Sequence, residues 1–396
     1  MIGRNRRSKR SSRIPSAGWH RVAIRVALLL TTALLPSITW AWGNDGHEII
    51  AVIAADNLSA AARDHVGKIL GVDPSNLPAV ADAMTHAAIR PDMEFRMEDH
   101  STAPWHFIDL CLQDKRSDVE KRCPGGNCVA GRIIDYTACL RNENYDQWGS
   151  DGDLAFLIHF VGDIHQPLHT ATNADRGGNC VHVQSQPSSK ELHATWDTGL
   201  IHQLERKFGV TPGENDVPQI VGRRLEQYYK AHPYSDAFSW KTNSAYDLAW
   251  ESTGIARSEI YTRLNIPTEP CEPDLTSCEI SPAEVQNEVI SLDSDYLSRE
   301  TDVAGLQLTR AGYRLAALLN QTWPSPAPAG WTRGSSSAQK ASEATVVGSI
   351  VGNRRSMIYA WPGCGSYDRM APHNRVVFAS REAAEAAGYR AARNCP

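Results

Sequence analysis

The segment Leu154–Ile164 restricts the fold of this 396-residue chain more than any other part of it. Its side chains are apolar on almost every side, and a helix of that kind has to be buried. It nevertheless carries His159 and Asp163, and a spacing of four residues stacks these two on one helical face. Burying both without a partner would cost on the order of several kcal/mol. The segment therefore predicts a buried helix whose polar pair either forms a mutual hydrogen bond or binds a metal ion.

A second pair, His193 and Asp197, has the same spacing. One such pair alone fits a solvated helix face equally well. His169 lies between the two pairs, directly after Gln166-Pro167-Leu168. Two pairs with a histidine between them favour metal binding over the interpretation as a solvated face.

Further metal-binding side chains stand in order along the chain. His47, five residues after Trp42, and His106, between Trp105 and Phe107, would each be a weak signal alone. Zinc takes three or four ligands such as these, and catalytic sites keep one position open for water. The whole set is large enough for three zinc ions, which is typical of a multi-zinc hydrolase. Its members are Trp42, His47, Asp92, His106, His159, Asp163, His169, His193 and Asp197.

The first residues have the features of a secretory signal peptide. A basic stretch, Arg4–Arg13, precedes an apolar run, Val26–Ile38, and Thr39-Trp40-Ala41 offers small residues where a signal peptidase reads. The alternative is a membrane anchor, but the run is short for a span of about 20 residues. Cleavage here would make Trp42 the first residue of the mature protein. We therefore expect a secreted or periplasmic protein from which residues 1–41 are removed.

The charge of the remaining chain limits its function. Removing residues 1–41 takes away eight Lys and Arg side chains and no acidic one, so the formal net charge moves from −5 to −13. Such an acidic body argues against a DNA-coating protein that works through basic patches. It does not exclude a nuclease, because bound zinc ions supply positive charge where a phosphate sits.

All nine cysteines follow residue 110, and disulfides are expected in an exported chain. Cys123 and Cys128 bracket Pro-Gly-Gly-Asn, and Cys271 and Cys278 close another short loop, so both pairs are predicted as local disulfides. The other cysteines before residue 200 have no partner that the sequence assigns. Because nine is an odd number, at least one thiol is free or bonded to another chain.

Helical periodicity dominates before residue 345, where the alternation typical of strands is scarce. Residues 323–345 are rich in Pro, Ser, Ala and Gly, which is typical of a flexible linker. We therefore expect an all-α main domain over residues 42–322 and a small α+β module over residues 346–396. Helices are expected at Glu48–Asn57, Ser59–Leu70 with Ser59 as its N-cap, Leu154–Ile164, Val221–Ala231, Ser239–Tyr261, Ser281–Ser298 and Asp302–Asn320.

In these motifs the chain resembles the zinc-dependent single-strand-specific nucleases of fungi and plants, whose mainly helical fold is similar to that of the bacterial zinc phospholipases C. The resemblance runs from Trp42 to about Trp323. It is carried by Trp42 with His47, by Trp105 to Asp109, by Phe156 to His169, by Gly177-Gly178-Asn179, by Leu192 to Asp197 and by Ala311 to Asn320.

The resemblance implies three zinc ions per chain. One would be held by Asp92, His106, His159 and Asp163. A second, bridged to it by Asp163, would use His47 with the free amino nitrogen and the carbonyl oxygen of Trp42. The third would bind His169, His193 and Asp197 and keep positions open for water or phosphate.

The resemblance also implies catalytic roles for Asp92, Asp163 and Arg96. In the family an aspartate follows Trp-Ala or Trp-Pro ahead of the Trp-His motif, and that tryptophan is missing here. Asp92, fourteen residues before His106, fits this position better than Asp82, which lies twenty-four residues before it. Arg96 is the nearest candidate for the family's phosphate-contacting arginine.

Phe107 and Asp109 match the family's base-stacking and base-edge positions. A duplex hides the faces of its bases, so an enzyme that stacks on a base favours unpaired strands. The implied activity is hydrolysis of single-stranded DNA and RNA to 5′-phosphorylated products, with removal of 3′-phosphates from mononucleotides as an additional expectation.

Two other functions are alternatives. A zinc phospholipase C of the same superfamily would place its first histidine further from the mature Trp and end its last ligand pair with Glu, whereas here the gap is five residues and the last ligand is Asp197. A non-catalytic zinc-binding protein would not require the open coordination positions that this ligand set leaves.

Residues 346–396 resemble the small metal-binding domain of the Ada repair protein, in elements such as Pro362-Gly363-Cys364 and Asn374–Phe378. The full metal-binding version uses four cysteines, whereas this one has only Cys364 and Cys395. We therefore expect a disulfide between these two, and an auxiliary role in substrate binding for the module.

Overall fold

The computed structural model describes residues 42–184, 191–211, 214–230, 244–271 and 289–325, together with Cys278 and parts of the stretch from 350 to 395. The expected signal peptide, residues 1–41, lies outside these described residues. The expected linker lies outside them too, except for its first residues, 323–325. Within the described ranges, no helix combines the length and the apolar character needed to cross a membrane.

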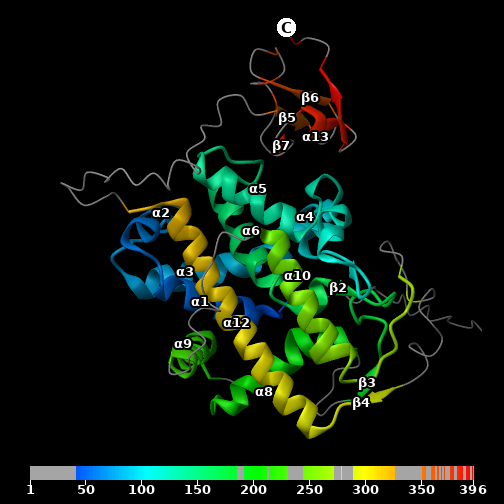
Figure 1. The fold of residues 1–396 in the computed structure, drawn as a ribbon. Coiled ribbons are helices and arrows are strands. Elements are labelled where there is room, and N and C mark those ends of the chain that lie inside the picture. Colours follow the sequence, from blue (N-terminus) through cyan, green and yellow to red (C-terminus); the bar gives the residue numbers. More distant parts are fainter. Residues whose placement is uncertain are drawn as a thin grey trace, which may run out of the picture. The chain divides into compact units, whose positions relative to one another are not determined.

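Packed helices form the described part of the chain before residue 325 (Figure 1), so the all-α prediction is confirmed. Three short π-helical segments interrupt this pattern in the described residues. Two of them, Pro91–Phe95 and Thr195–Gly199, contain Asp92 and Asp197, and the third is Ala256–Tyr261. The helices are α1 (Asn44–Asp56), α2 (Ala60–Leu70), α3 (Leu77–Arg90), α4 (Arg96–Glu98), α5 (Val129–Arg141), α6 (Gly149–Asp163), α7 (Leu192–Ala194), α8 (Leu200–Lys207), α9 (Val217–Lys230), α10 (Ala245–Ile255) and α12 (Ser294–Thr322).

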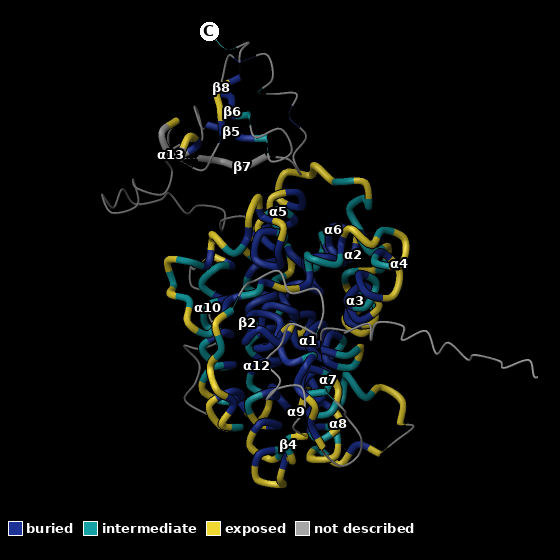
Figure 2. The backbone as a smooth tube through the Cα atoms, turned by 90° about the vertical axis from the view of Figure 1, so that its right-hand side faces the viewer, coloured by how far each residue is buried: buried dark blue, intermediate teal, exposed yellow. Residues whose placement is uncertain are grey.

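Helix α6 lies at the centre of the hydrophobic core. Every residue from Gly152 to Asp163 is buried, as expected for the apolar segment Leu154–Ile164. It packs against α3 and α5, while α1 packs against α3, α9 and α12. Figure 2 shows the buried backbone gathered in the interior of the helical domain. The centre of the core therefore contains the helix that carries His159 and Asp163.

Local side chains explain where several helices begin and end. Ser59 Oγ accepts a hydrogen bond from the Ala62 N–H at 3.1 Å, so Ser59 is the N-cap of α2 as predicted. Asp293 caps α12 in the same way, accepting from the Tyr296 N–H at 2.7 Å. Such caps satisfy backbone donors that have no partner within the helix.

The cap at Asp293 also shows where one helix prediction is wrong. We expected a helix over Ser281–Ser298, but α12 begins only at Ser294 and Ile290–Ser291 form strand β4. Residues 281–288 of that prediction lie outside the described residues. Helices α3, α5 and α8 were not expected either. Helix α3 is rich in alanine and has few large apolar side chains that would reveal a helical period.

Short strands join distant loops. β1 (Leu110–Cys111) pairs in parallel with β2 (Ala171–Thr172), and β3 (Val183–Gln184) pairs in parallel with β4. In the C-terminal part, a separate four-stranded sheet has the order β7-β5-β6-β8 and is accompanied by a helix, which confirms the small α+β element. Its members are β5 (Ile350–Asn353), β6 (Ile358–Ala360), β7 (Arg375–Phe378), α13 (Arg381–Ala386) and β8 (Arg390–Ala391).

The disulfides confirm two predicted pairs and correct a third. Cys123–Cys128 and Cys364–Cys395 form as predicted. The predicted Cys271–Cys278 pair is wrong, because Cys271 bonds Cys111 and Cys278 bonds Cys180, over sequence separations of 160 and 98 residues. The one free thiol is that of Cys139, which is buried. The short spacing of Cys271 and Cys278 gave no sign that each lies beside a different loop.

Candidate metal centre

One ring nitrogen of His159 is hydrogen-bonded to the backbone, and the other faces two carboxylates. Its Nδ1 lies 2.7 Å from the carbonyl oxygen of Ala88, which can only accept, so Nδ1 carries the proton. Nε2 therefore presents its lone pair, 3.3 Å from Asp163 Oδ2 and 3.7 Å from Asp92 Oδ2. A backbone carbonyl that fixes the tautomer in this way is typical of metal-binding histidines.

Asp163 lies between two sets of imidazoles. Its Oδ1 is 3.3 Å from Nε2 of His47, while its Oδ2 is 3.1 Å from Nδ1 of His106 and 3.3 Å from Nε2 of His159. The His47 and His159 rings stack with their centroids 3.9 Å apart. One fully buried carboxylate thus faces donors that come from α1, α6 and the segment before Phe107.

Asp92 joins this arrangement through the π-helical segment Pro91–Phe95. Its Oδ1 is 3.5 Å from His106 Nδ1 and 3.5 Å from Nη1 of Arg96. The alternative, Asp82, lies on the exposed surface of α3 and accepts a hydrogen bond from Gln219. The structure therefore places Asp92, and not Asp82, beside His106 and His159.

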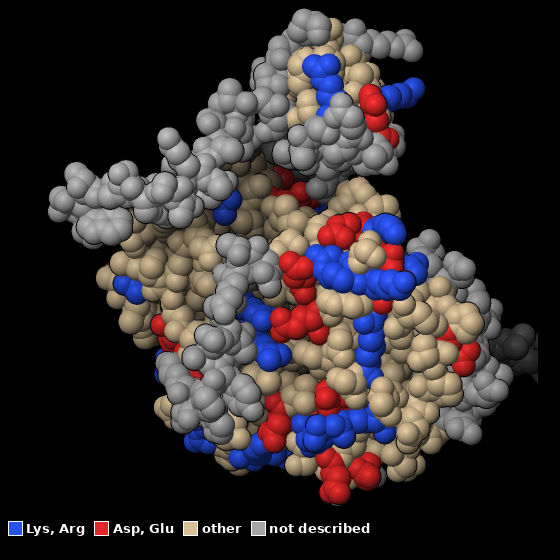
Figure 3. Space-filling model, in the orientation of Figure 1, with Lys and Arg blue, Asp and Glu red and all other residues tan. Residues whose placement is uncertain are grey.

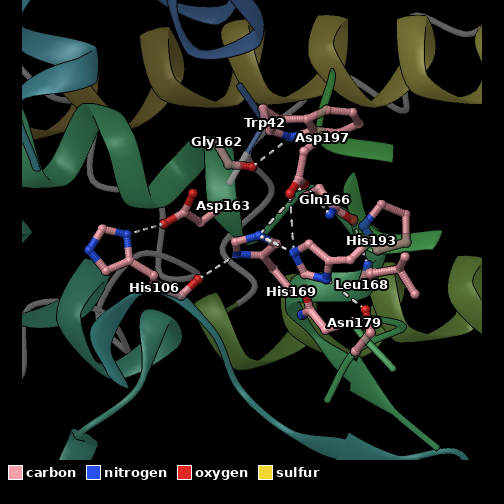
Figure 4. Close-up of polar contacts among 12 residues, drawn as sticks. Trp42, His106, Gly162, Asp163, Gln166, Leu168, His169, Asn179, His193 and Asp197 are labelled. Carbon is pink, nitrogen blue, oxygen red and sulfur yellow. Dashed lines mark hydrogen bonds and ion pairs between the residues drawn. The ribbon is translucent and has the colours of Figure 1, made fainter. Parts of the chain in front are cut away.

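The third group is formed by His169, His193 and Asp197 (Figure 4). Nδ1 of His169 donates to the His106 carbonyl at 2.8 Å, and Nδ1 of His193 donates to the Gly177 carbonyl at 2.6 Å. Both Nε2 atoms consequently present lone pairs, and they face each other at 3.2 Å. Oδ2 of Asp197 lies 3.3 Å from His193 Nε2. Two lone pairs directed at each other repel unless a cation lies between them.

Several buried polar atoms in these groups have no hydrogen-bond partner. They are both ring nitrogens of His47, Oδ1 of Asp92, Nε2 of His106 and Oδ1 of Asp163. Such atoms are rare in folded proteins and each calls for an explanation, such as a bound ion. Ligand atoms lie within 4.8 Å of one another in each of three buried groups, which are His47, His159 and Asp163; Asp92, His106 and His159; and His169, His193 and Asp197. The donor types, His nitrogens and carboxylate oxygens, are those that zinc binds, so the residues present fit zinc ions.

Burial dominates the electrostatics of this centre. None of the nine predicted metal-binding residues is more than 5% exposed. Burial raises the pKa of Asp163 and of Asp197 well above the usual range. It also lowers the pKa of His193 to about 4, which keeps this imidazole neutral and able to bind metal at neutral pH. A divalent cation would supply the positive charge that buried carboxylates otherwise lack.

The segment that contains Trp42 is fastened to the same centre. The fully buried Trp42 indole donates from Nε1 to the carbonyl oxygen of Gly162 at 3.0 Å. A Cβ atom at Gly162 would lie only 2.7 Å from Nδ1 of His47, so glycine is required where α6 meets that ring. The backbone around Trp42 is therefore held beside His47 and Asp163.

With this geometry established, the chain can be compared with known proteins. Residues 42–324 match the S1/P1 nuclease family. The chain belongs to that family. As a member it is a nuclease, that is, a hydrolase of phosphodiester bonds, and zinc dependence is typical of the family.

Nucleases of fungi and plants are among its relatives. Nuclease S1 of Aspergillus oryzae is 26% identical over 294 residues, which cover 73% of this chain and 94% of the relative. Nuclease P1 of Penicillium citrinum is 25% identical over 286 residues, or 71% of this chain and 97% of the relative. Endonuclease 2 of Arabidopsis thaliana is 34% identical over 192 residues, but that match covers only 46% of this chain and 63% of the relative, less than two thirds of its length.

The predicted substrate-binding residues of this S1/P1 nuclease lie next to the third group. The Ile108 N–H donates to the His169 carbonyl at 2.9 Å, which holds the loop of Phe107 and Asp109 against that histidine. The Phe107 side chain is 38% exposed, although it is large and apolar, whereas Asp109 is partly buried. An exposed aromatic ring beside a metal centre is available to stack on a base.

A pocket of about 400 Å³ reaches Asp197 from the N-terminus of α1. Gly43, Asp45, Met93 and Thr198 are among its lining residues. On the face shown in Figure 3, acidic and basic side chains of the described residues are mixed, without a broad basic patch.

The sequence did not assign a role to several groups that position the donors. The carbonyl oxygens of Ala88 and Gly177 hold His159 and His193, and the side chain of Gln166 contacts Asp197. Any residue supplies a backbone carbonyl, so no sequence signal marks the first two. Gln166 lies inside the motif that resembles the nucleases, but its partner is 31 residues away.

Proposed function

We propose that this protein is a zinc-dependent endonuclease that hydrolyses single-stranded DNA and RNA to 5′-phosphorylated products. The observation that carries the proposal is the set of three adjoining His and carboxylate groups in one buried centre, several of whose polar atoms have no hydrogen-bond partner. Membership of the S1/P1 nuclease family supports the same reaction class.

Three sets of residues would hold three zinc ions. The sets are Asp92, His106, His159 and Asp163; His47 and Asp163 with the amino nitrogen and carbonyl oxygen of Trp42; and His169, His193 and Asp197. Bound zinc supplies Lewis acidity and positive charge towards a phosphate group. The position of Asp163, with one oxygen towards His47 and the other towards His106, supports its assignment to two sets.

Asp92 and Arg96 would act on the reacting groups. Attack of water on phosphorus forms a new P–O bond and breaks the P–O3′ bond; the attacking water gives up a proton, and the departing O3′ takes one up from solvent. Asp92 Oδ1 has no hydrogen-bond partner and would take up the proton of the water. Arg96, whose side chain is 22% exposed beside Asp92, would bind a phosphate oxygen, because a guanidinium matches phosphate as well as carboxylate.

Phe107 and Asp109 would give the preference for single strands. The ring of Phe107 would stack on one base and Asp109 would accept a hydrogen bond from a base edge. Stacking requires an unpaired base but tolerates any of them, so cleavage would have low sequence specificity. Breaking the same P–O3′ bond at a terminal phosphate would also give 3′-nucleotidase activity.

We further propose the division of the chain made from its sequence: a signal peptide (1–41), a nuclease domain (42–322), a linker (323–345) and a C-terminal module (346–396). The protein would act outside the cytoplasm, secreted or periplasmic. Its four disulfides support this, because such bonds persist in oxidising compartments. Removal of the signal peptide would give Trp42 the free amine that its role as a ligand requires.

The deciding experiment uses protein that begins at Trp42. Zinc per chain is measured by elemental analysis, beside hydrolysis of a single-stranded oligonucleotide, its duplex and a phosphatidylcholine. We expect about three zinc ions and rapid cleavage of the single strand only, lost in His159→Ala and kept in His100→Ala, an exposed histidine.

The other outcomes lead to the alternatives. Zinc with hydrolysis of the lipid alone would show a phospholipase C. Zinc without hydrolysis of any phosphodiester would show a non-catalytic zinc-binding protein. Absence of bound zinc would contradict the proposed centre itself.

A further inference from the structure

Gln166 is fully buried and lies between His169 and Asp197, two of the predicted metal ligands of the third group. Its Oε1 accepts a hydrogen bond from the Leu168 N–H at 2.6 Å, and its Nε2 donates to Oδ1 of Asp197 at 2.6 Å. In Figure 4 the side chain extends from the turn before His169 towards the carboxylate of Asp197. Both ends of this amide are therefore occupied.

The orientation of the amide follows from its partners. A backbone N–H can only donate, so the oxygen of Gln166 has to face Leu168. A carboxylate can only accept, so the NH₂ group has to face Asp197. The flipped amide would bring oxygen against carboxylate and N–H against N–H, and both contacts would repel.

This hydrogen bond makes the two oxygens of Asp197 different. Oδ1 is held by Gln166 and lies 3.9 Å from His169 Nε2, whereas Oδ2 lies 3.3 Å from His193 Nε2. Without the amide, the carboxylate could rotate and exchange the two atoms. The hydrogen bond thus selects the oxygen that is presented to His193.

The same residue also holds the turn that presents His169. Pro167–His169 forms one turn of 3₁₀-helix, whose N-cap is Gln166. Besides the bond to its side chain, the Gln166 backbone carbonyl accepts from the His169 N–H at 3.0 Å. The side chain and the backbone of Gln166 therefore connect the turn of His169 with Asp197, which lies 31 residues after Gln166 in the sequence.

We propose that Gln166 is a positioning residue for the His169–His193–Asp197 group: by holding Oδ1 of Asp197 it presents Oδ2 to His193, and it thereby sets the affinity of this group for its metal ion. The inference rests on the proposed zinc dependence. Losing a partner that orients a metal ligand typically lowers metal affinity or activity by about 10–100-fold.

Two substitutions test the proposal on the full chain produced in an exporting host. Gln166→Leu removes both hydrogen bonds, and Gln166→Glu keeps the size of the side chain but places a second carboxylate against Asp197. Metal-free protein is titrated with Zn²⁺ against a chromophoric chelator, which measures the affinity of each equivalent separately from activity. Hydrolysis of a single-stranded oligonucleotide is then followed at limiting and at high zinc concentration.

Gln307 provides a matched control. It is also a fully buried glutamine, its Nε2 donates to the His165 carbonyl at 2.9 Å, and its Oε1 accepts from Arg310. Gln307→Leu therefore removes a comparable pair of buried hydrogen bonds, but neither of them involves a predicted metal ligand. Its thermal stability is expected to fall while all zinc affinities stay at their original values.

We expect both Gln166 variants to lose affinity for one zinc equivalent by about 10–100-fold. Their activity should be low at limiting zinc and recover when zinc is raised, which a general loss of folding would not allow. Unchanged affinity of every equivalent, or an equal loss in all of them together with the stability loss of Gln307→Leu, would overturn the proposal. If the unsubstituted protein binds no zinc, the proposed function fails instead, and the two failures are thereby distinguished.

Discussion

The backbone N–H of Gly43 donates a hydrogen bond to the backbone carbonyl oxygen of Asp197 over 2.8 Å. Gly43 directly follows Trp42, whose indole is bonded to Gly162 at the end of α6. The first described residues of the chain thus contact both the Asp163 side of the centre and the third donor group. Their placement makes the centre a single structural unit built from widely separated segments.

Asp163→Asn should cause the largest loss of bound metal. The substitution replaces the carboxylate that lies between His47 and His106, and an amide is a poorer ligand than a carboxylate. Zinc per chain and hydrolysis of single-stranded DNA should fall together. The activity should fall by more than about 10–100-fold, which is the typical loss when a residue that only orients a metal ligand is removed. Elemental analysis and initial rates check this. The control is Asp153→Asn, the same change at another buried position of α6, which should retain its zinc.

Asp153 itself should make stability depend on pH. Burial, followed by the hydrogen bond and the negative charge of Asp146, raises the pKa of Asp153 to about 9, from an ordinary value of about 3.9 in the unfolded chain. Between these values the folded state binds the proton more tightly than the unfolded chain, so the free energy of unfolding falls as pH rises.

Asp153→Asn removes this dependence. The variant should gain stability relative to the original protein by about 4 kcal/mol between about pH 5 and about pH 8, because each pH unit in this range contributes about 1.4 kcal/mol. Urea unfolding of both proteins at the two pH values measures the difference, in which contributions from the metal centre cancel. A difference that stays constant with pH would show that Asp153 does not titrate in this range.

Gly162→Ala should displace His47. The added Cβ would lie 2.7 Å from Nδ1 of that ring, closer than real Cβ atoms approach other atoms. We expect loss of about one zinc equivalent, because His47 belongs to only one ligand set. Metal analysis checks the prediction. Gly254→Ala, in α10, meets no atom within 4 Å and should instead stabilise the helix by about 0.5–1 kcal/mol, with full zinc content.

Phe107→Ala should weaken substrate binding and leave the metals in place. Stacking of the exposed ring on a base is worth about 1–3 kcal/mol of binding free energy. Its loss should therefore raise KM for single-stranded DNA roughly 5–150-fold at unchanged zinc content. Tyr145→Ala serves as the control, because Tyr145 is about as exposed, at 37%, and has no assigned role. Equal effects of the two variants would exclude a specific role for Phe107.

The sequence predicted best those features that depend on short spacing. His159 with Asp163, and His193 with Asp197, lie one helical turn apart, so each pair meets whatever the rest of the chain does. The capping role of Ser59 and the disulfide between Cys123 and Cys128 are local in the same sense. These parts needed no knowledge of how distant segments pack.

Features that depend on distant packing were harder to predict. Asp82 and Asp92 could not be told apart with certainty from sequence, because the choice depends on α3 carrying one to the surface and on a π-helical segment turning the other inward. The partners of Cys271 and Cys278 were missed for the same reason. Each is bonded to a loop that only tertiary structure brings near.

The disulfides Cys111–Cys271 and Cys180–Cys278 link the two ends of the segment from Cys271 to Cys278 to two other loops of the protein. Cys111 lies two residues after Asp109, and Cys180 directly follows Asn179 near His193. If a protease cut the chain between Cys271 and Cys278, the two fragments would remain covalently joined through Cys180–Cys278. Such a nicked molecule would migrate as one species on a gel without reductant and as two with it. Cleavage at this position would therefore leave helix α12 attached to the rest of the nuclease.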